Sequence, residues 1–175
     1  FTLSHTMPVN NKEPALNRSQ IWQGLLLKAE NPVPFLDAMT ACTVIDRGDN
    51  WLLRDFTLRD EDMQERVTFE PEERVTFERT RSAAMGTILN EILTLDDGSM
   101  GLRFTFTLDV DGLADGSPEE TAFAERMSQS YFQGVAAHWR KSAARCGPVS
   151  WMLRKEGPLE ISRIVRDRFS PWMKD

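Results

Sequence analysis

The chain has 175 residues and a mass of 20.0 kDa, which suits one domain with a sizeable hydrophobic core. Its hydrophobic fraction of 41% and its five tryptophans exclude intrinsic disorder, and its net charge of −6 disfavours a nucleic-acid binder, which needs a basic face. No apolar run approaches the roughly 20 residues that span a bilayer. We therefore expect a cytoplasmic protein that binds neither nucleic acid nor membrane.

Cysteine and histidine are scarce. Cys42 and Cys146 are too few for a disulfide framework, and the two cysteines and two histidines form no paired metal-ligand motif. The amino end lacks the basic region of a signal peptide, and the chain contains no glycine-rich phosphate loop or nucleophile elbow. These absences predict a reduced intracellular compartment, with no metal and no cofactor.

The first third of the chain predicts a strand followed by two helices. Apolar and polar residues alternate over 1–7, as in a strand, which Pro8 ends. A helix is expected after Leu16, capped by Asn17 or Ser19 and stopped by Asn31-Pro32. Its apolar positions at helical spacing are Ile21, Trp22, Leu25, Leu26 and Ala29. A second short helix is expected from Val33 to Met39.

Six further strands are expected next. They are predicted over 40–47, 51–59, the two copies of a repeated hexapeptide, 83–95 and 100–110, with turn signals between most of them. In 83–95 neither face is clearly apolar. Whether Asn90 or Glu91 reaches the interior is left open by the sequence.

The repeat Glu65–Glu70 and Glu73–Glu78 reads Glu-Arg-Val-Thr-Phe-Glu in both copies. The alternation of polar and apolar residues predicts two strands of a hairpin, with one buried face and one solvent-exposed face. Both copies present valine and phenylalanine to the same face only if the loop holds an odd number of residues, such as Pro71-Glu72-Glu73, or includes a bulge.

One long helix is predicted over about 118–145, capped by Ser117 or Asp115 and ended by Gly147-Pro148. The predicted elements follow the order strand, two short helices, six strands and one long helix. This order predicts an α+β helix-grip fold. In it, a curved antiparallel sheet of about seven strands wraps around the long helix and leaves a cavity between them. We expect this domain to cover 1–147, with an extension over 148–175 that carries an amphipathic helix at about 158–169.

Three segments resemble one family. Leu16–Pro32, Cys42–Arg54 and Glu65-Arg-Val-Thr-Phe-Glu-Pro71 are similar to the AtaL-like family of the START and birch-pollen-allergen-like (SRPBCC) superfamily, over roughly residues 3–145. The resemblance implies the helix-grip fold and a ligand pocket. Superfamily members are polyketide cyclases, dehydratases, carriers and lipid or hormone binders, and the AtaL-like branch looks like proteins encoded near natural-product pathways. It supplies no catalytic motif.

A helical wheel of 118–145 places one stripe toward the sheet, made up of Phe123, Met127, Tyr131, Gly134 and His138. An imidazole that faces a cavity can move protons near neutral pH, so His138 is a candidate acid or base. The phenol of Tyr131 can orient a carbonyl. The alternative for each is a core role, in which His138 hydrogen-bonds a backbone carbonyl and Tyr131 only packs.

On the sheet, Arg54 shares the apolar side of 51–59. If Asp60-Glu61 forms a two-residue turn, Phe56 faces Glu65 and Arg54 faces Val67, so Arg54 and Glu65 lie diagonally within salt-bridge reach. An inward ion pair is a site candidate because burying charges is costly. The expected apolar pocket residues on the sheet are Phe56, Val67, Phe69, Phe104 and Phe106.

These features support two principal functions. The first is a cofactor-independent enzyme of polyketide or terpenoid biosynthesis, which cyclises, dehydrates or isomerises a hydrophobic intermediate. His138 would act as acid or base, Arg54 would stabilise an oxyanion, and Glu65 would orient the substrate or take a proton. The second is a non-catalytic carrier for a hydrophobic small molecule. A module that docks a partner through its tail helix is a third possibility. The protein is expected to be a monomer or a homodimer.

Overall fold

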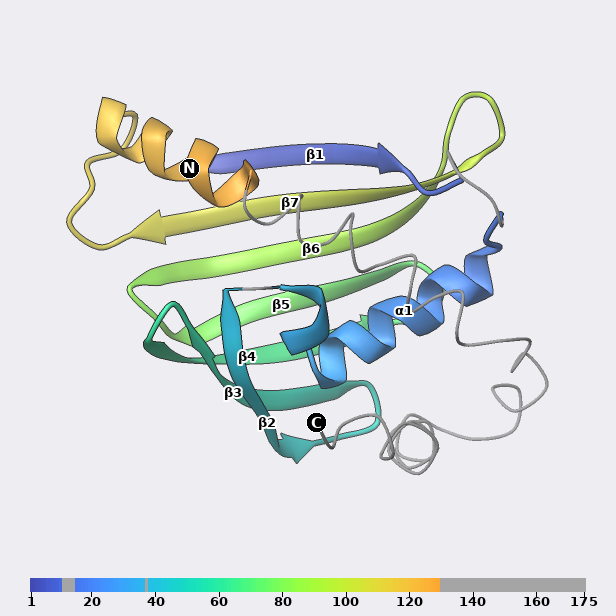
Figure 1. The fold of residues 1–175 in the computed structure, drawn as a ribbon, viewed down its shortest axis with the longest axis horizontal. Helices are drawn as coiled ribbons and strands as arrows, with labels where there is room; N and C mark the ends of the chain where they lie inside the picture. The colour runs from blue at the N-terminus through green and yellow to red at the C-terminus, as the bar shows by residue number, and fades with distance from the viewer. Residues whose placement is uncertain (11–14, 37, 130–175) are drawn as a thin grey trace.

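The computed structural model describes residues 1–10, 15–36 and 38–129. Seven strands form one antiparallel sheet in the order β1-β7-β6-β5-β4-β3-β2, so β2 to β7 make a meander and β1 pairs with β7 (Figure 1). The sheet confirms the predicted seven-stranded antiparallel architecture. The strands are β1 (Thr2–Pro8), β2 (Met39–Arg47), β3 (Trp51–Leu58), β4 (Glu61–Glu70), β5 (Arg74–Arg81), β6 (Ala84–Thr94) and β7 (Met100–Val110).

Helix α1 (Arg18–Glu30) begins with a capping box. Asn17 Oδ1 accepts a hydrogen bond from the Gln20 amide at 2.9 Å, and Gln20 Oε1 accepts one from the Asn17 amide at 3.0 Å. Asn17, rather than Ser19, is therefore the cap. Asn31 is the C-cap, as the sequence predicts.

The predicted second helix is shorter than expected. Between α1 and β2, the described residues form a single 3-10 turn, η1 (Val33–Phe35). The amide of Leu36 donates to the carbonyl of Pro32, and Met39 is already the first residue of β2. The chain leaves the helical conformation at Leu36, whose backbone is extended (φ −133°, ψ 103°).

The repeated hexapeptides form the β4–β5 hairpin, and its loop confirms the prediction of an odd number of loop residues. Glu70 pairs with Arg74, which leaves the three residues 71–73 as the loop. Glu72 adopts a φ of 59° and the Glu73 amide donates to the Glu70 carbonyl, as in a type II turn with proline at its second position. The valines and phenylalanines of both copies consequently share the buried face.

The predicted register between β3 and β4 is wrong by two residues. Arg59 and Asp60, not Asp60 and Glu61, form the turn, and both have positive φ values (50° and 67°), as a type I′ hairpin requires. Arg54 therefore pairs directly with Glu65, and Phe56 pairs with Met63. A shift of two preserves the face of every side chain, so Arg54 and Glu65 still point inward.

The core lies on the inner face of the sheet. Ile21 and Leu25 of α1 are fully buried against inward residues of the strands, among them Phe104 and Phe106. A further helix begins at residue 118 and is described through 129, beside the start of β1 (Figure 1). Its Glu120 amide donates to Ser117 Oγ at 3.1 Å, so Ser117 is its cap. The predicted continuation to 145 and the helix at 158–169 lie outside the described residues.

None of the helices formed by residues 1–10, 15–36 and 38–129 has the length and apolar character that a membrane span requires.

Candidate functional site

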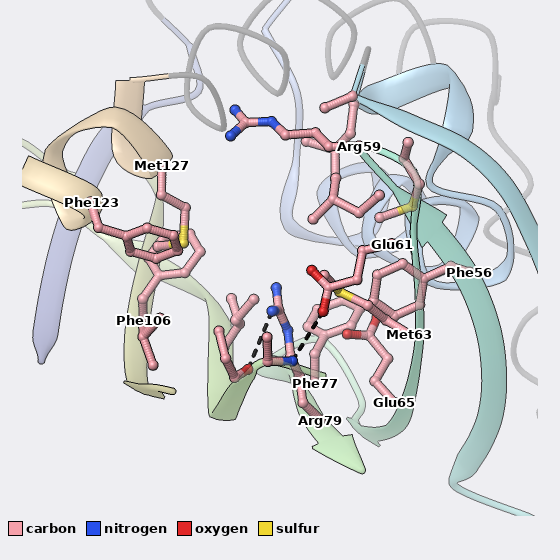
Figure 2. Close-up of a pocket in the computed structure, with 18 of the residues that line it drawn as sticks. Phe56, Arg59, Glu61, Met63, Glu65, Phe77, Arg79, Phe106, Phe123 and Met127 are labelled. Atoms are coloured by element: carbon pink, nitrogen blue, oxygen red, sulfur yellow. Dashed lines mark hydrogen bonds between the residues drawn. The ribbon is translucent and has the colours of Figure 1, made fainter. Parts of the chain in front are cut away.

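A cavity of about 440 Å³ opens on the inner face of the sheet. Side chains from α1, β3 to β7, the segment around Met39 and the 118–129 helix line it. Figure 2 shows Phe123 and Met127 on one side of the cavity, facing Phe56 and Met63 on the other. A volume of this size falls within the range of small-molecule sites.

An ion pair lies in the wall of this cavity. Arg54 Nε donates to Glu65 Oε1 at 2.9 Å, Arg54 Nη2 bonds the same oxygen, and the two side chains are only 3% and 4% exposed. Arg54 Nη1 donates to the carbonyl of Lys28 at 3.0 Å and also to that of Ala29. These carbonyls belong to the last turn of α1, where a helix lacks internal donors. Arg54 therefore joins the sheet to the end of α1.

Lys28 is a second buried cation in the wall, only 2% exposed. Its Nζ lies 4.9 Å from the ring centre of Phe77 and 5.6 Å from that of Phe104. With the Asn90 amide oxygen turned toward it, Nζ donates to that oxygen at 2.8 Å. Burial, followed by repulsion from Arg54, lowers the pKa of Lys28 to about 7, although Glu65 opposes the change.

Arg79 is the third buried cation, 8% exposed, at the base of the cavity in Figure 2. Its Nη1 donates to Ser82 Oγ at 3.2 Å and to the Ala84 carbonyl at 3.3 Å. Arg79 is the strand partner of Glu65, on the side away from Arg54. The carboxylate-bearing Glu65 of β4 thus lies between Arg54 of β3 and Arg79 of β5.

The expected site residues fall into three groups. Phe56, Phe106, Phe123 and Met127 line the cavity, together with Arg54 and Glu65. The expected pocket residues Val67, Phe69 and Phe104 are instead buried core residues that do not line it. Helix α1 covers this part of the sheet, where Trp22 packs edge-on against Phe69 with ring centres 6.4 Å apart. Tyr131, Gly134 and His138 lie outside the described residues.

Sequence reasoning missed Lys28 and Arg79, although each carries a signal. Lys28 follows Leu25 by three residues and Ile21 by seven, so it belongs to the buried stripe of α1. Arg79 follows Phe77 by two residues and therefore shares its inward face. The sequence left open whether Asn90 or Glu91 reaches the interior. Asn90 is the one that is fully buried, and Glu91 instead accepts a hydrogen bond from Arg103 Nε at 2.9 Å.

Among the described residues, no group of three or more histidine, cysteine, aspartate and glutamate side chains could hold a metal ion.

Comparison with known proteins gives a family match. Residues 3–143 match the model of the family described as acetylaranotin biosynthesis cluster protein L (AtaL). No curated protein matches the chain.

Solved structures share the fold at low sequence identity. The ZhuI aromatase/cyclase from Streptomyces sp. R1128 is 16% identical with a TM-score of 0.60, and the match covers 85% of this chain and 99% of that one. The di-domain aromatase/cyclase StfQ of the steffimycin pathway is 13% identical with a TM-score of 0.65, covering 85% and 52%. A START superfamily protein from Mycobacterium smegmatis is 14% identical with a TM-score of 0.60, covering 80% and 97%.

Proposed function

The chain belongs to the acetylaranotin biosynthesis cluster protein L family, and from that membership we propose that it binds a hydrophobic biosynthetic intermediate in its cavity and promotes cyclisation, dehydration or isomerisation there without a cofactor. The observation that carries the proposal is an apolar cavity of about 440 Å³ with charged side chains set into its wall. Apolar walls hold a substrate in a reactive shape, and a few fixed charges act on its polar atoms.

In this proposal His138 moves the proton and Tyr131 orients a carbonyl, both from the stretch that the sequence predicts as one long helix over about 118–145. Glu65 and Arg54 form a fixed dipole in the wall, which stabilises negative charge that develops on the substrate. Because Arg54 already bonds Glu65 and two carbonyls of α1, its action on the substrate is electrostatic and needs no new hydrogen bond.

A carrier without catalysis is the second candidate. The full engagement of Arg54 with Glu65 and with the end of α1 favours it, since a pair that holds the fold together has few hydrogen bonds left for chemistry. Both functions require that the cavity accept an apolar molecule.

Binding is tested with the neutral fluorescent probe N-phenyl-1-naphthylamine. The wild type is expected to bind it with a micromolar Kd, and Ala84→Trp, which fills the cavity, should abolish binding. Met85→Trp is the matched control, because Met85 is 40% exposed and its side chain points away from the cavity on the next position of β6. Equal binding by all three proteins would overturn the cavity as the site.

Catalysis is tested in the organism that carries the gene. A His138→Ala protein that binds the probe normally should cause an intermediate to accumulate, either isomeric with the product or heavier by one water. Accumulation of no such intermediate, with the pathway's final product merely reduced, would favour the carrier.

A further inference from the structure

Lys28 places a primary amine in the wall of the cavity. It is the one lysine in residues 1–10, 15–36 and 38–129. Its side chain is 2% exposed, so bulk water has little access to it, whereas a molecule held in the cavity lies against it. A lysine in such a position can act on a ligand by forming a bond as well as by its charge.

The surroundings of Lys28 favour the neutral amine, which is the nucleophilic form. Burial, followed by repulsion from Arg54, lowers the pKa of Lys28 to about 7, although Glu65 opposes the change. At pH 7, about half of the Lys28 side chains are therefore neutral, against fewer than about one in a thousand for a lysine with the ordinary pKa.

The contacts of Lys28 are compatible with attack by its nitrogen. An ammonium has three N–H donors, and a neutral amine keeps two of them and gains a lone pair. With the Asn90 amide oxygen turned toward it, Nζ donates one hydrogen bond to that oxygen at 2.8 Å. A protonated iminium still carries one N–H, so this hydrogen bond survives the reaction. The rings of Phe77 and Phe104, 4.9 Å and 5.6 Å from Nζ, stabilise a cation in either form.

We propose that Lys28 is a covalent catalytic residue, and that the ligand of the cavity is an apolar aldehyde or ketone whose carbonyl carbon it attacks. The inference rests on the proposed function, since it names the substrate class and a further catalytic group for the same cavity. The apolar body of the carbonyl compound then lies against side chains such as Phe56, Phe106, Phe123 and Met127.

The covalent step is balanced without a further reactant. The amine nitrogen of Lys28 bonds the carbonyl carbon and passes one of its protons to the oxygen. The resulting hydroxyl takes up the proton that was released when the ammonium became an amine, and it leaves as water while the C=N bond forms. Overall, an ammonium and a carbonyl become an iminium and water, so the charge at the site is unchanged.

An iminium supports each of the proposed reactions. It withdraws electrons from the neighbouring carbon, so a proton is lost there more easily and an enamine forms. The enamine can attack a second carbonyl in a cyclisation, expel a β-hydroxyl group in a dehydration, or regain its proton at another carbon in an isomerisation. Water then hydrolyses the iminium and restores the amine of Lys28.

Reductive trapping with 2-naphthaldehyde and sodium cyanoborohydride at pH 7 tests the inference. The hydride reduces the C=N bond to a stable secondary amine, so each iminium leaves a naphthylmethyl group that peptide mass spectrometry locates. The full chain supplies four reference lysines, Lys12, Lys141, Lys155 and Lys174. We expect Lys28 to be labelled at least about tenfold faster than each of them, because more of it is neutral at this pH.

Three variants show where the label forms. Lys28→Arg keeps a cation but removes the amine, so its total label should fall to that of the reference lysines. Ala84→Trp, which fills the cavity, should slow the labelling of Lys28 at least about tenfold. Arg81→Lys is the matched control, because Arg81 is exposed and pairs with Asp55 outside the cavity. Its new lysine should be labelled no faster than the reference lysines.

Labelling of Lys28 no faster than of the reference lysines, in a protein that binds N-phenyl-1-naphthylamine, would overturn the inference and leave the proposed function standing. Undiminished labelling of Lys28 in Ala84→Trp would place the reaction outside the cavity and would also contradict the inference. Failure of the wild type to bind N-phenyl-1-naphthylamine would overturn the proposed function and the inference with it. If a variant does not fold, the relative labelling of the lysines in the wild type decides alone.

Discussion

Arg54 and Glu65 face each other directly across β3 and β4, with both side chains almost completely buried. The same arginine bonds the carbonyls of Lys28 and Ala29, so a single side chain connects a strand, its neighbour and the end of α1. Removing one member of such a pair leaves the other charge buried without compensation.

We therefore expect Glu65→Leu to lower the free energy of unfolding by about 3–5 kcal/mol. The double variant Arg54→Met/Glu65→Leu should recover part of this loss, because it removes both charges, but not all of it, because the α1 carbonyls lose their donor. Urea denaturation of the two variants and the wild type measures the difference. A double variant less stable than Glu65→Leu would show that the contacts of Arg54 to α1 outweigh its buried charge.

Lys28 predicts a dependence of stability on pH. Its pKa is lowered from 10.5 to about 7 in the folded protein, so between these values the unfolded chain binds more protons. The contribution of Lys28 should therefore make the protein more stable as pH rises from about 7 to about 10.5, by on the order of a few kcal/mol, and should be flat below pH 7.

Thermal unfolding of the wild type and Lys28→Met across this range isolates the effect. Other groups titrate in both proteins, so the difference between the two curves reports Lys28. We expect the stability of Lys28→Met to exceed that of the wild type by the largest margin near pH 7, and this margin to shrink toward pH 10. Parallel curves would mean that Lys28 keeps an ordinary pKa.

The turn of the repeat hairpin offers a simple gain in stability. Glu72 adopts a φ of 59°, a left-handed conformation that costs a residue with a side chain roughly 1 kcal/mol and costs glycine almost nothing. Glu72→Gly should raise the free energy of unfolding by up to about 1 kcal/mol. The matched control is Glu73→Gly, whose backbone is not left-handed, and which should be neutral or destabilising. Denaturant midpoints compare the two.

Much of the fold follows from local patterns in the sequence. The repeated hexapeptide predicted a loop with an odd number of residues, such as the observed three. Only such a loop, or a bulge, brings the valines and phenylalanines of both copies to the same face of the sheet. The sequence predicts Asn17 or Ser19 as the cap of α1, because either side chain suits the first turn of a helix, and Asn17 is the cap in the structure. The β3–β4 register failed because acidic residues at 60–62 suggested a turn one residue too late. Nothing local indicated that Arg59 would adopt a positive φ.

The candidate site was less predictable than the fold. Arg54 and Glu65 were found because alternation fixes the face of a strand residue, whatever the register. Lys28 was missed because a lysine on a helix is usually solvated, and its burial arises from the aromatic rings of two distant strands. Val67 and Phe69 were assigned to the pocket because the sequence does not specify where α1 crosses the sheet.

The pairing of β1 with β7 has a consequence for the order of assembly. Each of the strands β2 to β6 pairs with the next strand along the chain, whereas Ser4 of β1 meets Thr105 of β7 across 101 residues. Closing so long a loop is slow, so we expect pulse-labelled hydrogen exchange to protect amides of β4 and β5 before those of β1. Within this sheet, the strand that is synthesised first is then the last to find its place. Until it does, β7 remains an open edge, and this interval is when the protein is most vulnerable to aggregation.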